Sequence, residues 1–333
     1  MKTGKLPEHT FKRSVVNPIK YWSDDTTFRP GVGHDGAVIG DMVTSMATTA
    51  FCYTGNERYA LNNAINNVIA AGGVPYAVSV AILLPEHSEE ATLRKIVGNI
   101  TEKAAEYQIE VIAGHTELVP SVIRPTITVT AYGRVLWKNR HHEVKPGMDI
   151  VMTKWVGLYG GALLAKLKEE ELRTRYPKSY IQVAADYMEK TNLMGELSVI
   201  QKVVREKPDC IFAAHDVSNG GVFGAMWQLC VACNCGAQIY LEQIKVKQEI
   251  IEISEYFDLN PYMMNGQGSL LMVTNDGNTF VEQMKAAGIE ASVIGHTICG
   301  NDRKVMIGDE ERFLVPPKGD ALNVVFYGQK MQI

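Results

Sequence analysis

The sequence predicts an α/β protein of the α+β type that is divided into two domains, and three observations lead to this prediction. The chain has 333 residues, 46% of them hydrophobic and 21% charged, which suits a globular chain long enough for two cores. Segments with apolar residues at helical spacing alternate with short segments typical of strands. A turn at 145–149, KPGMD, precedes a new apolar strand. We therefore place the domain boundary there, with domains at 1–146 and 147–333.

The first half is expected to contain helices packed on one face of a sheet. Leu61, Ile65 and Val68 define one face of a helix at 59–71, and Gly72 stops it. Ser88 opens a second helix with an acidic first turn. Apolar or alternating runs place strands at 77–84, 109–113 and 125–135. This order suits an α+β domain.

The second half repeats the alternation of strands and helices. Helices are expected at 160–172, 181–189, 196–206, 221–232 and 279–287, and strands at 150–153 and near Cys210, Ile239, Leu270, Val293 and Val305.

The charge of the chain favours a small-molecule ligand over a nucleic acid or a membrane. The formal net charge is -4, the pI is near 6.1 and no long run of Lys and Arg occurs, which argues against a nucleic-acid or anionic-membrane surface. The N-terminus has no apolar signal core, and no stretch is long enough to span a bilayer. We therefore expect a cytoplasmic protein.

The six cysteines are expected to be reduced thiols, because no secretion signal is present. Cys230, Cys233 and Cys235 form a tight cluster that has two interpretations. They can be small apolar residues on and just after a buried helix, or they can bind a metal with Cys210 or His215 as a fourth ligand. No second cysteine pair at zinc-finger spacing supports the metal.

The segment at 111–125, VIAGHTELVPSVIRP, carries residue types that suit oxyanions and metals. A short apolar strand runs into Gly114, and His115, Thr116 and Glu117 follow. Glycine at a strand end lets backbone N–H groups and short side chains approach a ligand closely. We therefore predict that these four residues face one ligand. The alternative is an ordinary turn with a solvated His and Glu.

A second polar segment, GVGHDG at 31–36, matches the dinucleotide pattern G-x-G-x-x-G, but strand-like sequence follows it where that fold needs a helix. We expect Gly31 and Gly33 to form a flexible clamp instead. Asp35 is placed to meet Mg²⁺ carried by a nucleotide phosphate, although an Asp here can also cap a turn.

A third segment, AAHDVSNGG at 213–221, has an apolar strand that ends in polar residues and two glycines before a helix. This order is typical of an anion or metal site at a helix N-terminus. Asp216 is the expected metal ligand or reactive carboxylate, and Ser218, Asn219 and Gly220 are expected to contact the cofactor. Ser218 or Asn219 can instead merely cap the helix.

The order of these segments resembles the AIR synthase-like superfamily of ATP-dependent enzymes, and within it the HypE-like branch. Nine motifs that span nearly the whole chain carry the resemblance: GKLP at 4–7, GVGHDGAVI at 31–39, NNVIAAGGVP at 66–75, LLPE at 83–86, AGHTELVPSVIRP at 113–125, TKWVGLYGGALLA at 153–165, HDVSNGG at 215–221, NPYMMNGQGSLL at 260–271 and VIGHT at 293–297.

The resemblance implies an N-terminal domain that pairs with its copy in a homodimer, a C-terminal α+β domain, and ATP held in a cleft between the two domains. It also implies a reaction, because family members use ATP to phosphorylate an oxygen or selenium centre, often an amide or carbonyl oxygen that then becomes a leaving group. HypE does this to a carbamoyl thioester on its own C-terminal cysteine. By this resemblance Asp35 and Asp216 hold Mg²⁺, Gly114 to Thr116 meet phosphate, and Asp216 and His115 are the catalytic candidates.

The sequence departs from the family pattern in three respects. The last cysteine is Cys299 and the chain closes with FYGQKMQI, so we expect no acceptor for self-cyanation. Asn67 and Ala50 stand where relatives have aspartates, and His115 stands where many have an aspartate. Because Mg²⁺ prefers charged oxygen ligands, Asn67 and Ala50 should weaken magnesium binding.

Two functions therefore follow from the sequence. In the first, the protein is an ATP-dependent enzyme that acts on a small carbonyl, amide or phosphate substrate. In the second, it is a nucleotide-binding relative that has lost turnover and acts as a binding or assembly factor, because phosphoryl transfer depends on charge neutralisation by the metal.

Overall fold

The computed structural model describes residues 5–49, 56–316 and 319–328, and every structural statement below concerns these ranges. The chain divides into two compact units. The small unit contains residues 23–30 and 35–136, and the large unit contains residues up to 22, 31–34 and those from 137 onward. We describe each unit by itself. The predicted domain boundary at 146 stays a prediction.

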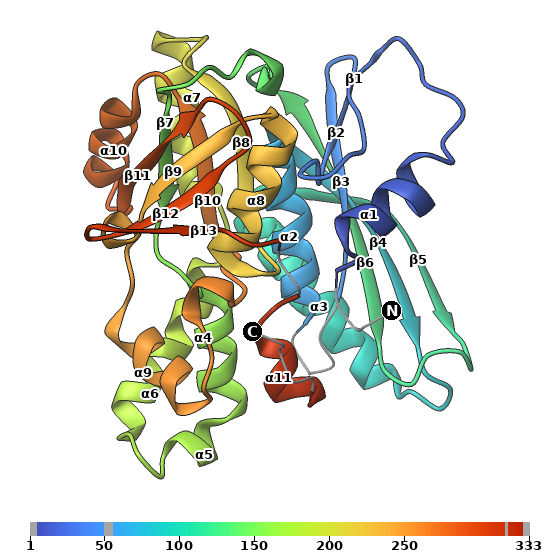
Figure 1. Cartoon of the computed structure of the whole chain (residues 1–333). Coiled ribbons are helices and arrows are strands. Elements are labelled where there is room, and N and C mark those ends of the chain that lie inside the picture. The colour runs from blue at the N-terminus through green and yellow to red at the C-terminus, as the bar shows by residue number, and fades with distance from the viewer. Residues whose placement is uncertain (1–4, 50–55, 317–318, 329–333) are drawn as a thin grey trace. The chain divides into compact units, whose positions relative to one another are not determined.

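The small unit is a six-stranded sheet with two helices (Figure 1). Its strands lie in the order β1-β2-β3-β6-β4-β5, and only the β4–β5 pair is parallel. The elements are β1 Thr26–Phe28, β2 Ala37–Ile39, β3 Met42–Thr48, α2 Glu57–Ala70, β4 Gly73–Leu84, α3 Glu90–Glu106, β5 Glu110–Leu118 and β6 Thr126–Val135. Helix α2 packs on β3, β4 and β6, and its Leu61, Ile65 and Val68 are fully buried. The predicted apolar face is therefore the core of this unit.

The large unit is built on a seven-stranded sheet in the order β13-β12-β9-β11-β7-β10-β8. Its strands are β7 Asp149–Thr153, β8 Ile211–Val217, β9 Gly236–Tyr240, β10 Ser269–Thr274, β11 Ala291–Ile298, β12 Arg303–Ile307 and β13 Glu310–Phe313. Only the β9–β12 pair is parallel. Strand β10 pairs antiparallel with both β7 and β8, so the end of β8 lies beside the start of β10.

Helices surround this sheet. They are α1 Glu8–Phe11, α4 Leu158–Leu167, α5 Glu169–Leu172, α6 Lys178–Asp186, α7 Met194–Glu206, α8 Gly221–Cys233, α9 Gln248–Tyr256, α10 Gly277–Ala286 and α11 Leu322–Tyr327, with short helical turns η1 Lys12–Val16, η2 His141–Glu143, η3 Tyr187–Lys190, η4 Leu241–Gln243 and η5 Pro261–Met263. Helix α8 lies against one face of the sheet and α10 against the opposite face, while α4, α6 and α9 pack together as a group (Figure 1). Val222, Met226 and Leu229 of α8 join the buried core.

The predicted fold class is confirmed, and the differences from the predicted elements are local. The strand expected at 109–113 continues to Leu118. The helix expected at 160–172 is interrupted at Lys168. Helix α3 begins at Glu90 with Glu89 as its N-cap residue, and the Ser88 hydroxyl donates to the Pro85 carbonyl, 2.7 Å away. Helix α9 was not predicted.

None of the described helices is both long and apolar enough to cross a membrane. The five described cysteines are all free thiols, as the sequence predicted for the chain.

Candidate functional site

Asp216 lies near the end of β8, one strand residue before the turn that leads into α8. Its side chain is 1% exposed, and Leu270 of β10 is its partner across the sheet. The preceding residue, His215, is also buried, and its Nδ1 donates to the backbone oxygen of Asp216 at 2.6 Å. A carboxylate held this deeply needs a cation or hydrogen-bond donors nearby. This position therefore suits the role predicted for Asp216.

The turn at 218–221 is held by contacts from the segment at 265–269. The Asn265 Nδ2 donates to Asn219 Oδ1 at 2.9 Å, and the Gly266 N–H donates to the Ser218 carbonyl at 3.4 Å. The N-cap residue of α8 is Gly220, which has no side chain to cap the helix. Neither Ser218 nor Asn219 therefore occupies the N-cap position. The Asn219 side chain instead joins the turn to Asn265.

A second buried carboxylate, Asp320, lies beneath the same turn. Its Oδ2 accepts from the Gly220 N–H at 2.8 Å, and its Oδ1 accepts from the Leu322 N–H at 2.9 Å. Burial raises the pKa of Asp320 to about 6, although these N–H donors oppose the rise. The sequence did not single out Asp320. An Asp before a short apolar run signals a helix start, but that signal does not show a contact with a residue 100 positions earlier.

Gly33 packs closely against helix α8. Its backbone φ is +79°, and a Cβ added there would lie 2.3 Å from the Gln228 carbonyl oxygen of α8. Gly31, two residues earlier, pairs with His34 in an isolated β-bridge. Packing thus explains the glycine at position 33, and the flexible clamp at Gly31 and Gly33 stays a prediction.

Asp35 and Asn67 come from segments that meet inside the small unit. The Asp35 carbonyl accepts from the Ser45 hydroxyl at 2.6 Å. A Cβ at the next residue, Gly36, would lie 3.5 Å from the Asn67 carbonyl oxygen. Asn67 is 6% exposed, and its Oδ1 has no hydrogen-bond partner among the groups that the structure describes. Ala50, the other substituted position, lies outside the described residues.

The four residues from Gly114 to Glu117 lie within the exposed edge strand β5 and not in a loop. Because successive side chains of a strand point to opposite faces, His115 and Glu117 share one face and Thr116 faces the other way. The His115 Nε2 and Glu117 Oε2 lie 3.1 Å apart. A Cβ at Gly114 would lie 2.6 Å from the Val80 carbonyl oxygen of β4, so the glycine is explained by strand packing. The expectation that all four residues face one ligand is not met by this strand.

Two family models match the chain. The model of the AIR synthase related protein N-terminal domain matches residues 25–135, and that of the C-terminal domain matches residues 145–308. The chain belongs to the AIR synthase-related family.

Similar AIR synthase-related proteins include hydrogenase maturation factors. A putative hydrogenase expression/formation protein of Methanocaldococcus jannaschii is 24% identical over 72% of this chain and 69% of its own length. A carbamoyl dehydratase HypE of Rhodobacter capsulatus is 23% identical over 84% of this chain and 78% of its own length.

Solved structures share the AIR synthase-related fold. The structure of a HypE–HypF complex has a TM-score of 0.72 at 21% identity and covers 86% of this chain and 94% of its own. A HypE structure in complex with ATP has a TM-score of 0.67 at 15% identity and covers 93% of this chain and 92% of its own. At these identities the likeness shows the fold.

The family implies magnesium, and the donors present in this AIR synthase-related chain suit it in chemical type. Asp35 and Asp216 offer carboxylates, and the buried Asn67 Oδ1 is an amide oxygen with no hydrogen-bond partner in the described chain. Oxygen ligands of this kind suit Mg²⁺, but the amide carries no charge. Each of these oxygens is by type a possible magnesium ligand, two of them charged and one neutral.

The three clustered cysteines lie in the core of the large unit. Cys230, Cys233 and Cys235 are each less than 10% exposed and pack against the apolar residues of α8. Among the described residues they do not form a group whose ligand atoms all lie within 4.8 Å of one another. The Cys230 and Cys233 thiols hydrogen-bond to the Cys235 sulfur and lower its pKa to about 4. The positions agree with the interpretation of buried small residues.

Proposed function

We propose that this protein binds ATP and uses it to activate a small carbonyl, amide or phosphate substrate by phosphorylation. The observation that carries the proposal is the buried Asp216 followed by a turn that Asp320 and Asn265 hold in place at the N-terminus of α8. Such a helix N-terminus attracts phosphate through its dipole and N–H groups. The ATP complex of a HypE protein with this fold supports the choice of nucleotide.

The roles of the residues follow from the chemistry of phosphoryl transfer. The substrate oxygen attacks the γ-phosphorus, the bond to the β,γ-bridging oxygen breaks, and ADP leaves, so positioning and charge neutralisation set the rate. Magnesium, when bound, would supply that neutralisation, with Asp35 and Asp216 as its carboxylate ligands and the Asn67 amide oxygen as a neutral one. Ser218, Asn219 and Gly220 would orient the phosphates, since their turn is fixed by neighbouring side chains.

A second function is favoured by one observation. Asn67 is a neutral amide at a position where the sequence resemblance leads us to expect a carboxylate, and this weakens the magnesium site. The protein would then bind nucleotide without turnover and act in assembly. The relative named as a putative hydrogenase expression/formation protein supports this choice.

One experiment separates these functions. Titration calorimetry measures ATP binding with and without Mg²⁺, and a phosphate-release assay measures turnover, for the wild type, Asp216→Ala and Asn67→Asp. We expect Asp216→Ala to lower phosphate release by about 100-fold or more, because it removes a carboxylate ligand of the magnesium that would neutralise the transferred group. Asp209→Ala is the control, since the side chain of Asp209 is 86% exposed.

The outcomes divide clearly. Absence of ATP binding by the wild type contradicts both functions. ATP binding without phosphate release, with release appearing in Asn67→Asp, supports the assembly function. Phosphate release that is unchanged in Asp216→Ala contradicts the role given to Asp216.

The small unit also supports a homodimer. All nine residues of β5 are exposed at the edge of the sheet, and Val111, Ile112 and Leu118 are 38%, 52% and 55% exposed. An exposed apolar edge strand is a template for pairing with another chain. We therefore propose a second copy of this chain as its partner.

A further inference from the structure

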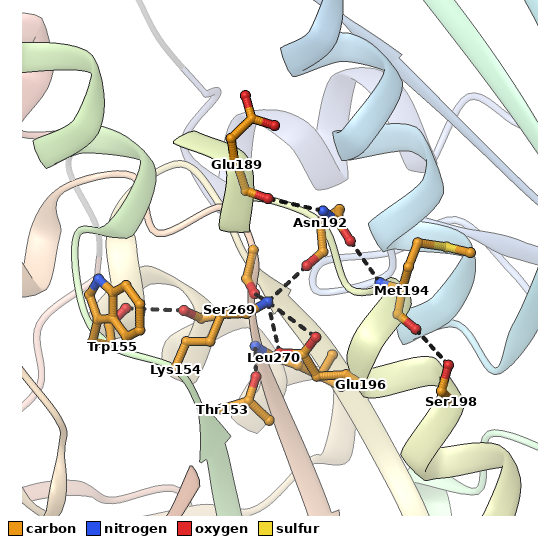
Figure 2. A network of polar contacts seen from close by, with 11 residues as sticks. Thr153, Lys154, Trp155, Glu189, Asn192, Met194, Glu196, Ser198, Ser269 and Leu270 are labelled. Carbon is orange, nitrogen blue, oxygen red and sulfur yellow. Dashed lines mark hydrogen bonds and ion pairs between the residues drawn. The ribbon is translucent and has the colours of Figure 1, made fainter. Parts of the chain in front are cut away.

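Lys154 is the residue after β7, and its side chain is buried. Its backbone φ is +55°, in the left-handed region that lysine rarely adopts. Its ammonium group donates to the Gly268 carbonyl at 2.6 Å and to the Asn192 carbonyl at 2.8 Å, and it lies 2.8 Å from Glu196 Oε1 (Figure 2). An ammonium group has three N–H donors, so these three partners use all of them.

The neighbours of Lys154 hold the same segment. The Leu270 N–H donates to the Thr153 hydroxyl at 3.1 Å, and the Ser269 hydroxyl donates to the Trp155 carbonyl at 3.0 Å (Figure 2). Three consecutive residues, 153–155, therefore hold three consecutive residues, 268–270. Gly268 has a φ of +104°, and a Cβ there would lie 2.5 Å from the Lys190 carbonyl oxygen. The backbone at Gly268 therefore leaves no room for a side chain, and its carbonyl accepts from Lys154.

This segment is the one that holds the proposed phosphate turn. Asn265 contacts the Asn219 side chain, and Gly266 contacts the Ser218 carbonyl. Ser269 and Leu270 pair with Val217 and Asp216 across the sheet. A shift of Gly268 would therefore displace both Asp216 and the turn.

We propose that Lys154 is a positioning residue that clamps the Gly268 and Asn192 carbonyls and so holds the segment at 265–270 against Asp216 and the Ser218–Gly221 turn. Glu196 is the third hydrogen-bond partner of the ammonium group and supplies the negative charge that balances it in this buried position. This inference rests on the proposed function for its link to ATP, while the clamp itself can be measured without any nucleotide.

Hydrogen–deuterium exchange of the full chain tests the clamp. In Lys154→Met we expect exchange in peptides covering 216–221 and 264–270 to become about tenfold faster. The hydrogen bonds of Lys154 are absent in this variant, so local opening of the segment costs less free energy. Lys154→Gly removes the clamp while easing the left-handed backbone, and it should give the same result if Lys154→Met does not fold. Glu196→Gln keeps the Lys154 side chain but removes the charge that balances its ammonium group, so exchange in both peptides should become faster than in the wild type, though less so than in Lys154→Met.

The control for lost stability is Thr274→Val, at the opposite end of β10, which removes a hydrogen bond of 2.8 Å to the Cys210 carbonyl. If Thr274→Val speeds exchange in the two peptides as much as Lys154→Met does, or if Lys154→Met leaves them unchanged, the clamp is refuted. ATP titration completes the test, and we expect Lys154→Met to weaken ATP binding about tenfold and Glu196→Gln to weaken it less. If the wild type does not bind ATP, the proposed function fails, and exchange still decides the clamp.

Discussion

The buried carboxyl group of Asp320 couples the stability of the large unit to pH. Its pKa is raised from 3.8 to about 6 by burial, so the folded protein holds this proton more tightly than the unfolded chain does. The stabilising contribution of the protonated form is complete below pH 3.8 and is lost as the pH rises through 6. Well above pH 6 the lost stabilisation no longer changes with pH. A pKa shift of this size corresponds to about 3 kcal/mol in the free energy of unfolding.

Asp320→Asn tests this directly, because an amide does not titrate. We expect the free energy of unfolding of the variant, relative to the wild type, to rise by about 3 kcal/mol between pH 4 and pH 7. Chemical denaturation across this pH range measures the difference. Asp209→Asn, at an exposed position, should show no such trend. If the difference in the free energy of unfolding between Asp320→Asn and the wild type does not change with pH, the raised pKa of Asp320 is contradicted.

Single residues also show where sequence reasoning reached its limit. Asp216 was selected as a candidate because a carboxylate before two glycines and a helix is a local pattern. Asp320 and Lys154 were missed because their partners, Gly220 and Gly268, lie about 100 residues away in the chain. A contact across such a distance leaves no periodic trace in the sequence.

At the scale of elements, the packing of the segment at 31–34 on α8 predicts a strong effect of a small substitution. Gly33→Ala would place a methyl group 2.3 Å from the Gln228 carbonyl oxygen at a φ of +79°. We expect a loss of about 3 kcal/mol or more in the free energy of unfolding, since both backbone strain and overlap contribute. Thermal and denaturant unfolding measure it.

Gly300→Ala is the matched control for this substitution. Its φ is +78°, but no atom lies within 4 Å of the added Cβ. It should therefore cost only the strain, about 1 kcal/mol. Equal losses for the two variants would show that the contact with α8 is not what requires glycine at position 33.

The elements that periodicity predicted well are those whose neighbours impose a buried face. Helix α2 and strand β6 show this, with Ile65 and Val129 fully buried. Strand β5 was predicted too short because Gly114 was interpreted as the end of a strand, whereas the glycine is required by the Val80 carbonyl of the adjacent strand. The sequence pattern shows Gly114 but does not show that Val80 of the adjacent strand lies next to it.

At the scale of the whole molecule, the exposed edge strand bears on the assembly of the protein. Ile112 on β5 and Ile123 just beyond it are 52% and 90% exposed, and solvent exposure of large apolar side chains at a strand edge favours association. The family resemblance led to the same expectation from sequence, but neither composition nor periodicity identified this edge.

Ile112→Lys should convert a dimer into a monomer, because a lysine on an edge strand opposes pairing with a second chain. Light scattering coupled to gel filtration at micromolar concentration measures the mass, and we expect the dissociation constant to rise about 100-fold or more. Val97→Lys on α3 is the control, since Val97 is 40% exposed in the same unit but lies on a helix. A wild-type protein that is monomeric would contradict the dimer. A dimer that persists in Ile112→Lys but dissociates in Val97→Lys would show that the interface does not include β5.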